Sequence, residues 1–186
     1  MSTQPLQAAI ASTKAILATV TPEQLDLPTP CASWKVSDLV NHIVGGQHFF
    51  TAALNGEAPA GEAPDFSSGD FNAAFDEAAS ACVAAFAVDG ALARTVKLPF
   101  GDMPAMAWAG LAATDTFTHG WDLAKATGQS TDLAPELAAG LLAASKQMIQ
   151  PAFRGEDGKA PFTAERTAPA GASAADQLAA FLGRDV

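Results

Sequence analysis

Apolar residues recur every three or four positions in several long segments of this chain, and this helical period constrains the fold more than any other feature. The clearest stripe lies in residues 36–55 and consists of Val36, Leu39, Ile43, Phe50 and Leu54. Prolines and glycines separate one periodic segment from the next. The pattern predicts helices over residues 5–19, 36–55, 70–87, 104–126, 134–149 and 173–182.

The helical pattern is interrupted between the third and fourth predicted helices. Residues 95–98 are typical of a short extended piece, and the Pro99-Phe100-Gly101-Asp102 run that follows is typical of a turn. We therefore expect either a small hairpin near 95–104 or a loop. The segments 56–68 and 151–171 are rich in glycine and proline and predict loops. The whole pattern predicts an all-α fold, a four-helix bundle with short additional helices.

Length and charge limit the classes of protein to which the chain can belong. Its 186 residues suit a single domain over 1–186. The formal net charge is -10 and the few basic residues are scattered, which disfavours nucleic acid and anionic membranes as partners. The N-terminus lacks the features of a signal peptide, and no apolar run reaches the length of a membrane span. We expect a cytoplasmic protein whose two cysteines, Cys31 and Cys82, are free thiols.

Polar side chains interrupt the apolar stripe of residues 104–126. Asp115 and His119 are four residues apart, so their side chains meet on one helix face. Placing them there is costly unless they are paired or bind a metal. His42 lies beside the stripe of the second predicted helix, and a bundle can bring it opposite the pair. Two imidazoles and one carboxylate with open positions are typical of a catalytic zinc site, and the set also suits iron or nickel.

Other interpretations of these residues stay open at this point. A histidine satisfied by a carboxylate can form a buried polar network that stiffens a bundle without any metal. Asp122, three residues after His119, is a candidate fourth ligand, a partner that orients a ligand, or a carboxylate bonded to a loop. The sequence shows no triad of a serine or cysteine nucleophile and no phosphate-binding glycine loop.

Residues around His42 also have two interpretations each. Asp38 lies one turn before His42, where it can orient the imidazole ring or stabilise the helix N-terminus. His48 is six residues after His42, so we expect it on another face, at the surface or rim. Gly45 and Gly46 leave room inside a helix, either for a ligand or for a close helix contact.

Two signatures in the chain resemble those of a known family. The first runs from Thr29-Pro30-Cys31-Ala32-Ser33-Trp34-Lys35-Val36 into Asp38-Leu39-Val40-Asn41-His42, and the second is His119-Gly120-Trp121-Asp122-Leu123-Ala124, followed by Thr127-Gly128. Together they resemble the DinB/YfiT-like superfamily, and more closely the N-terminal domain of mycothiol-dependent maleylpyruvate isomerase and its actinobacterial relatives. The tail, which ends in Gly183-Arg184-Asp185, resembles that of a short single-domain, metal-binding subgroup.

The resemblance implies a fold and a metal site. It implies a four-helix bundle with a divalent ion, often zinc, bound by a histidine of the second helix and an acid-x-x-x-His pair on a later helix. Those positions correspond to His42, Asp115 and His119, although the acid in the isomerase is glutamate. Members of the superfamily often form dimers, so a homodimer is also implied.

The resemblance gives two expectations about function. The first is a metal-dependent transferase or isomerase that uses a small-molecule thiol, such as mycothiol, to attack a small electrophile. The ion held by His42, Asp115 and His119 would lower the pKa of that thiol. The alternative is a non-enzymatic bundle that binds a metal or small ligand in a structural or sensory role.

Overall fold

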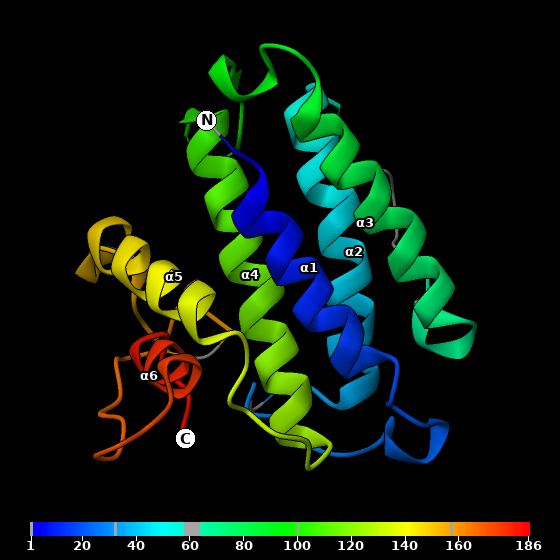
Figure 1. The fold of residues 1–186 in the computed structure, drawn as a ribbon, viewed down its shortest axis with the longest axis vertical. Coiled ribbons are helices and arrows are strands. Elements are labelled where there is room, and N and C mark those ends of the chain that lie inside the picture. Colours follow the sequence, from blue (N-terminus) through cyan, green and yellow to red (C-terminus); the bar gives the residue numbers. More distant parts are fainter. Residues whose placement is uncertain (1, 32, 58–63, 100, 157) are drawn as a thin grey trace.

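The computed structural model describes residues 2–31, 33–57, 64–99, 101–156 and 158–186. In these ranges the chain forms the helices α1 (Gln4–Leu17), α2 (Val36–Asn55), α3 (Phe71–Ala87), α4 (Ala105–Ala126), α5 (Pro135–Met148) and α6 (Ala174–Phe181), and the strands β1 (Thr95–Val96) and β2 (Met103–Pro104) (Figure 1). The predicted helices and the small antiparallel hairpin are confirmed. Residues 58–63 of the predicted 56–68 loop, and Phe100 of the predicted turn, lie outside the described ranges.

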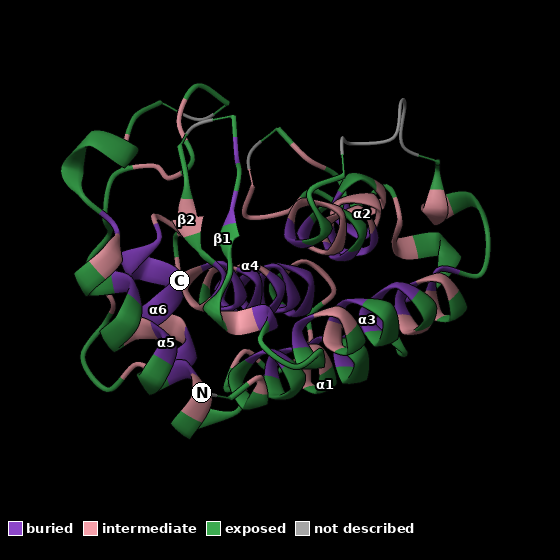
Figure 2. Ribbon diagram, turned by 90° about the horizontal axis from the view of Figure 1, so that it is seen from above, coloured by how far each residue is buried: buried purple, intermediate pink, exposed green. Residues whose placement is uncertain are grey.

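Helices α1 to α4 form a four-helix bundle in which α4 is central. α4 packs along α1 and also contacts α2, while α2 pairs with α3. Figure 2 shows that α4 is buried around most of its circumference, whereas α1 and α3 each expose an outer face. Because α2 and α4 are neighbours, side chains from these two helices can meet inside the bundle.

The packing of α2 follows from its apolar period. The predicted stripe is buried, and Phe50 is 4% exposed against Trp108 of α4. The two rings lie 4.7 Å apart between centroids, and the Trp108 Nε1–H donates to the Phe50 carbonyl at 3.1 Å. This contact satisfies the polar atom of a buried tryptophan and sets how α2 sits on α4.

A glycine allows α1 and α4 to approach closely. The Thr13 hydroxyl of α1 donates to the Thr116 carbonyl of α4 at 2.8 Å. A Cβ atom added at Gly120 would lie 2.4 Å from that hydroxyl oxygen and 3.2 Å from the Thr13 Cα. Only a residue without a side chain fits this crossing as it is built.

Helices α5 and α6 pack on each other beside the bundle and against α4 (Figure 1). The Trp121 Nε1–H of α4 donates to the Asp176 carboxylate of α6 at 2.8 Å. α6 ends in a Schellman motif, in which Gly183 adopts a φ of 98° and the N–H of Arg184 donates to the Ala179 carbonyl at 3.0 Å. The motif turns the chain back toward α4 immediately after the helix.

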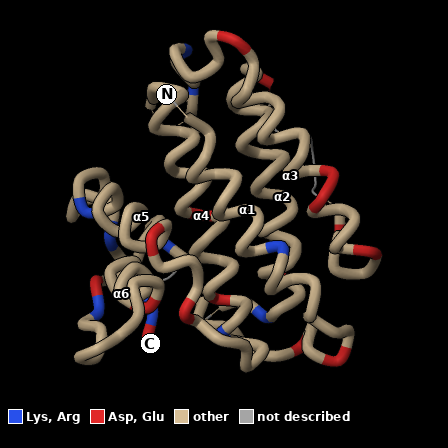
Figure 3. The backbone as a smooth tube through the Cα atoms, viewed as in Figure 1, with Lys and Arg blue, Asp and Glu red and all other residues tan. Residues whose placement is uncertain are grey.

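Charged residues lie mostly at helix ends and in the connections, as Figure 3 shows. None of the helices in the described part of the chain has both the length and the apolar content that a bilayer crossing requires. The absence of a nucleic-acid partner stays a prediction from the charge pattern.

Candidate metal centre

The three side chains predicted as metal ligands lie together between α2 and α4. His42 comes from α2, and Asp115 and His119 come from successive turns of α4. The Nε2 atoms of His42 and His119 lie 3.5 and 3.6 Å from the same Asp115 oxygen, Oδ1. One ligand atom from each of the three residues lies within 4.8 Å of the others. Their role as ligands stays a prediction, and the spacing of these atoms is compatible with a single ion.

The Nε2 atom of His42 is buried and has no hydrogen-bond partner within the described residues. Burial lowers the pKa of His42, but the Asp115 and Asp122 carboxylates raise it more, so the net shift is upward. Burial raises the pKa of Asp115, but His119, His42 and Arg184 lower it more, so the net shift is downward. The upward shift of His42 favours its cationic form and the downward shift of Asp115 favours its carboxylate, so each group favours its charged form beside the other. A divalent cation fits the orphaned nitrogen and the carboxylate.

Asp122 is completely buried, and its two oxygens are fully engaged. Arg184 binds them as a fork, with Nε donating to Oδ1 at 3.1 Å and Nη2 donating to Oδ2 at 2.9 Å. The Oδ2 atom also lies 3.0 Å from the His119 Nδ1 and 3.3 Å from the Cys31 sulfur. Three roles were left open for Asp122. This geometry favours a residue that orients the His119 ring and that also contacts the loop at Cys31.

The ionisation of Asp122 determines which nitrogen of His119 carries the proton. Burial raises the pKa of Asp122, but Arg184 and His119 lower it well below the usual range. An ionised carboxylate only accepts hydrogen bonds, so the His119 Nδ1–H is the donor. The Nε2 atom is on the opposite side of the ring and lies 3.6 Å from the Asp115 Oδ1. A carboxylate behind a histidine is the usual arrangement for orienting a metal-binding imidazole.

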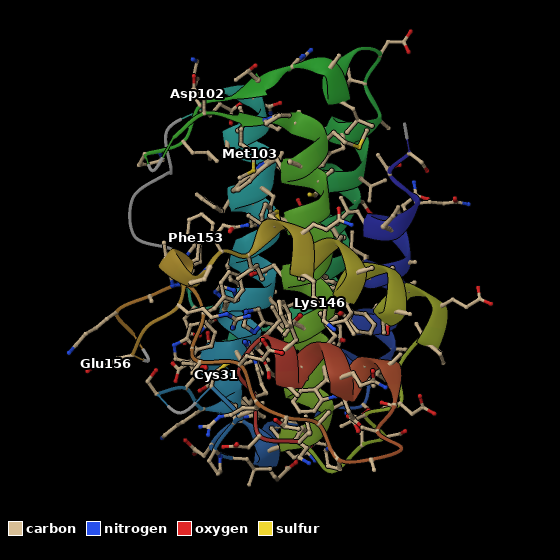
Figure 4. All side chains as sticks on the ribbon, turned by 90° about the vertical axis from the view of Figure 1, so that its left-hand side faces the viewer. Cys31, Asp102, Met103, Lys146, Phe153 and Glu156 are labelled. Carbon is tan, nitrogen blue, oxygen red and sulfur yellow. The ribbon has the colours of Figure 1, made fainter. Side chains whose placement is uncertain are left out.

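Cys31, His119 and Asp122 also lie close enough together to form a second candidate group for a metal. The Arg184 guanidinium already supplies the positive charge there. Burial, followed by the charge of Asp122, raises the pKa of the Cys31 thiol to about 12. The thiol is therefore a donor to Asp122 and a poor nucleophile. Figure 4 looks onto α5 and α6 and places Cys31 at the level of α6.

Trp34, in the connection before α2, covers the two imidazoles. Its ring centroid lies 4.7 Å from that of His42 and 5.6 Å from that of His119. A turn holds it in place, in which the Trp34 N–H donates to the Cys31 carbonyl at 2.8 Å. The signature from Thr29 to Val36 thus places one side chain over the candidate ligands and another behind Asp122.

The other residues considered around His42 play different parts. Asp38 is exposed and accepts a hydrogen bond from the Lys35 N–H at 2.9 Å, which is the role at the helix N-terminus. His48 is exposed and stacks on Phe66, as expected for another face. A Cβ at Gly46 would lie 3.6 Å from the Asp115 Oδ2, an ordinary contact distance, so this glycine leaves space beside the carboxylate.

An apolar groove of about 400 Å³ lies between α4 and α5, and none of the three candidate ligands lines it. Its walls are small or apolar side chains, among them Met106, Leu137 and Met148. Ionisable side chains are absent from its lining residues. The candidate ligands therefore lie in the polar cluster and not in this groove.

Arg184 is the site residue that the sequence pattern did not single out for a role. It lies 62 residues after Asp122, and the contact depends on how α6 packs against α4. The pattern did offer a signal in Asp122, since a carboxylate on a buried helix stripe needs a positive partner. Few basic residues were available to provide it, because the chain holds ten lysines and arginines in all.

The fold and the cluster define the class of the protein as a four-helix bundle with a candidate divalent-metal site. Residues 6–124 match the family of the mycothiol maleylpyruvate isomerase N-terminal domain, and the chain belongs to that family. This is a metal-binding family related to mycothiol. The identity of the metal and the reaction are matters for a proposal.

Two proteins from two strains of Mycobacterium tuberculosis, both described as uncharacterized, are each 48% identical to the chain over 174 residues. The alignment covers 92% of this chain and 91% of each relative. The similarity therefore extends beyond the family match and into the segment that contains α5 and α6. No solved structure matches the chain.

Proposed function

We propose that this protein binds one divalent metal ion through His42, Asp115 and His119 and uses it in a thiol-dependent transfer or isomerisation of a small electrophile. Zinc is the proposed ion, with nickel and iron as alternatives that suit the same ligands. Mycothiol is the proposed thiol because the family carries its name.

The proposal rests on the different partners of two carboxylates, Asp115 and Asp122. Asp122 is occupied by Arg184 and His119, which leaves Asp115 as the carboxylate that faces both imidazoles. The candidate site thus has three protein ligands rather than four. The side chains of His42 and Asp115 are 35% and 27% exposed, so the cluster lies near the surface, although the His42 Nε2 atom itself is buried. An open three-ligand site is typical of catalytic rather than structural zinc.

The residues of the chain would hold and shape this site. His42, Asp115 and His119 would hold the ion, and Trp34 would cover one side of the two imidazoles. When bound, the ion would supply Lewis acidity that lowers the pKa of a thiol and polarises an electrophile. The chain's own thiol at Cys31 is a poor substitute, because its pKa is raised to about 12. This supports a nucleophile that comes from outside the chain.

The alternative is a non-enzymatic bundle with a structural or sensory ion. A fourth protein ligand would have favoured it, and Asp122 was the candidate. Because Asp122 is already bonded to a guanidinium, the geometry supports the enzymatic proposal over this one. A polar network without any metal is a further outcome that the experiment below separates from both.

The experiment is metal analysis of the wild type and of His42→Ala and His119→Ala, purified without an affinity tag that carries metal. His48→Ala is the matched control, because it removes an exposed histidine of the same helix as His42. We expect about one ion per chain in the wild type and in His48→Ala, and much less in the two ligand variants. No metal in the wild type after incubation with zinc, nickel or iron would support the polar network.

A second measurement separates the enzyme from the binding protein. The zinc-loaded protein is incubated with mycothiol or another small thiol and with an electrophile whose conjugation changes its absorbance. We expect a rate above background that Asp115→Asn abolishes. A loaded protein with no rate for several thiols and electrophiles would favour the non-enzymatic alternative.

A further inference from the structure

Arg184 lies outside the family match of residues 6–124, yet it reaches the candidate centre. Its side chain is 14% exposed and both of its contacts to Asp122 are short. The guanidinium fork fixes the plane of the carboxylate, because two parallel N–H···O bonds define its orientation. In that orientation the Oδ2 atom also accepts from the His119 Nδ1–H at 3.0 Å.

The position of Arg184 is itself built by the end of α6. Gly183 has a φ of 98°, and a Cβ there would lie 2.0 Å from the Thr163 hydroxyl oxygen. The Gly183 carbonyl accepts a hydrogen bond from that same hydroxyl at 3.1 Å. The bond from Trp121 to Asp176 ties α6 to α4 one residue away from Asp122. The fork therefore follows directly on a hydrogen-bonded turn that is tied to Thr163 and to α6.

We propose that Arg184 is a positioning residue for His119: through Asp122 it holds the imidazole with its Nδ1–H toward that carboxylate and its Nε2 directed at Asp115. The inference rests on the proposed function, because the orientation of His119 serves metal binding only if the proposed site holds an ion. It adds that Arg184, which lies after the matched residues 6–124, completes the site. Within the described residues, the side-chain hydrogen bonds of Arg184 go to Asp122, Leu182 and Cys31 and not to the candidate ligands, so its positioning of His119 passes through Asp122.

The first test determines which ring nitrogen of His119 carries a proton in the metal-free protein. Long-range nitrogen–proton NMR of selectively labelled histidine distinguishes the Nδ1–H from the Nε2–H form at one fixed pH. We expect Nδ1–H in the wild type and the Nε2–H form in Asp122→Asn, because Arg184 would bind the amide oxygen and leave the amide N–H₂ to face His119. We expect Arg184→Met to lose the single Nδ1–H form. Wild-type rings in both variants would overturn the inference.

The second test measures affinity for zinc by competition with a chromophoric chelator, and for cobalt by its visible absorption. Loss of a partner behind a metal-binding histidine usually weakens binding by about 10- to 100-fold, and we expect this range for Arg184→Met and Asp122→Asn. Arg184→Lys keeps the charge without the fork, so its affinity should fall between that of the wild type and Arg184→Met. Arg166→Met is the matched control, since Arg166 is 55% exposed and pairs with Asp185.

The outcomes separate a positioning role from a merely structural one. If Arg184→Met lowers the melting temperature but leaves the affinity and ring form of the folded protein unchanged, Arg184 only stabilises the fold and the inference is wrong. If Arg184→Met does not fold, Arg184→Lys carries the same comparison. If the wild type binds no metal, the proposed function fails, and the ring form of His119 still decides the inference.

Discussion

At the scale of single residues, the polar cluster shows how a buried charge acquires its role from its partners. Asp115 and Asp122 are on the same helix and both have a lowered pKa, but their surroundings differ. Asp122 is compensated by a guanidinium inside the protein, whereas Asp115 faces two imidazole nitrogens. In the proposed site, the compensated carboxylate would orient a neighbour and the other would bind the cation.

The buried thiol of Cys82 predicts a loss of stability at alkaline pH. Burial raises its pKa to about 11, so the folded protein keeps the thiol proton where the unfolded chain, near its usual value of about 8.5, has lost it. Stability should therefore fall as pH rises from about 9 to about 11, by up to about 1.4 kcal/mol per pH unit from this group. Urea unfolding at several alkaline pH values measures the slope.

Cys82→Ala is the informative variant for this measurement. It lowers stability at every pH by leaving a small cavity, but it should flatten the alkaline slope because the titrating group is gone. Other groups titrate equally in both proteins, so the difference between the two slopes belongs to Cys82. Equal slopes would contradict the assignment.

Sequence reasoning predicted the three candidate ligands because each carries a local signal. Asp115 and His119 interrupt an apolar stripe at a spacing that places them together, and His42 lies beside a stripe on another helix. Arg184 carries no such signal, since an arginine after a short helix is ordinary at the surface. Its burial depends on the docking of α6, which no local pattern encodes.

At the scale of elements, α4 has two different functions on two of its sides. One side carries Asp115, His119 and Asp122, and another side must let α1 approach closely at Gly120. The helices themselves were predictable from period and from their proline and glycine boundaries, and the structure moves their ends by only one or two residues. The closeness of the α1–α4 crossing was not predictable, because a glycine in a helix does not reveal what it faces.

Gly120→Ala is expected to destabilise the protein. The added Cβ would meet Thr13 of α1, and separating two packed helices typically costs about 1–3 kcal/mol. Gly110→Ala is the matched control on the same helix, because a Cβ there meets nothing within 4 Å. Its better helix propensity should add up to about 1 kcal/mol of stability. Thermal and urea unfolding measure both, and a Gly120→Ala protein as stable as the wild type would refute the close crossing.

At the scale of the whole molecule, the segment that contains α5 and α6 adds a residue to the polar cluster of the four-helix bundle. The bundle supplies His42, Asp115, His119 and Asp122, and α5 and α6 pack beside it and deliver the partner of Asp122. The bundle class was predictable from the number and period of the helices. The placement of α5 and α6 was not, because their short amphipathic patterns fit several faces of α4. The homodimer implied by the resemblance stays a prediction.

Metal binding is expected to stabilise the whole fold. An ion that binds only the folded state at about 1,000 times its dissociation constant adds about 4 kcal/mol. For a chain of this size that raises the melting temperature by about 10 °C. Thermal unfolding with and without zinc measures the shift, and His119→Ala should abolish most of it while His48→Ala retains it. A wild type whose melting temperature is indifferent to zinc would argue against a site formed by folding.

The indole that covers the two imidazoles gives the protein a built-in optical reporter. Trp108 and Trp121 are buried and about 1% exposed, whereas Trp34 is half-buried and lies 4.7 Å from the His42 ring between centroids. Its fluorescence emission should therefore respond most strongly to an ion bound between the two imidazoles. An open-shell ion such as cobalt or nickel held there would quench Trp34 through space, while zinc, with its filled d shell, would leave the emission bright. Occupancy and metal identity can thus be followed by the fluorescence of the unlabelled chain.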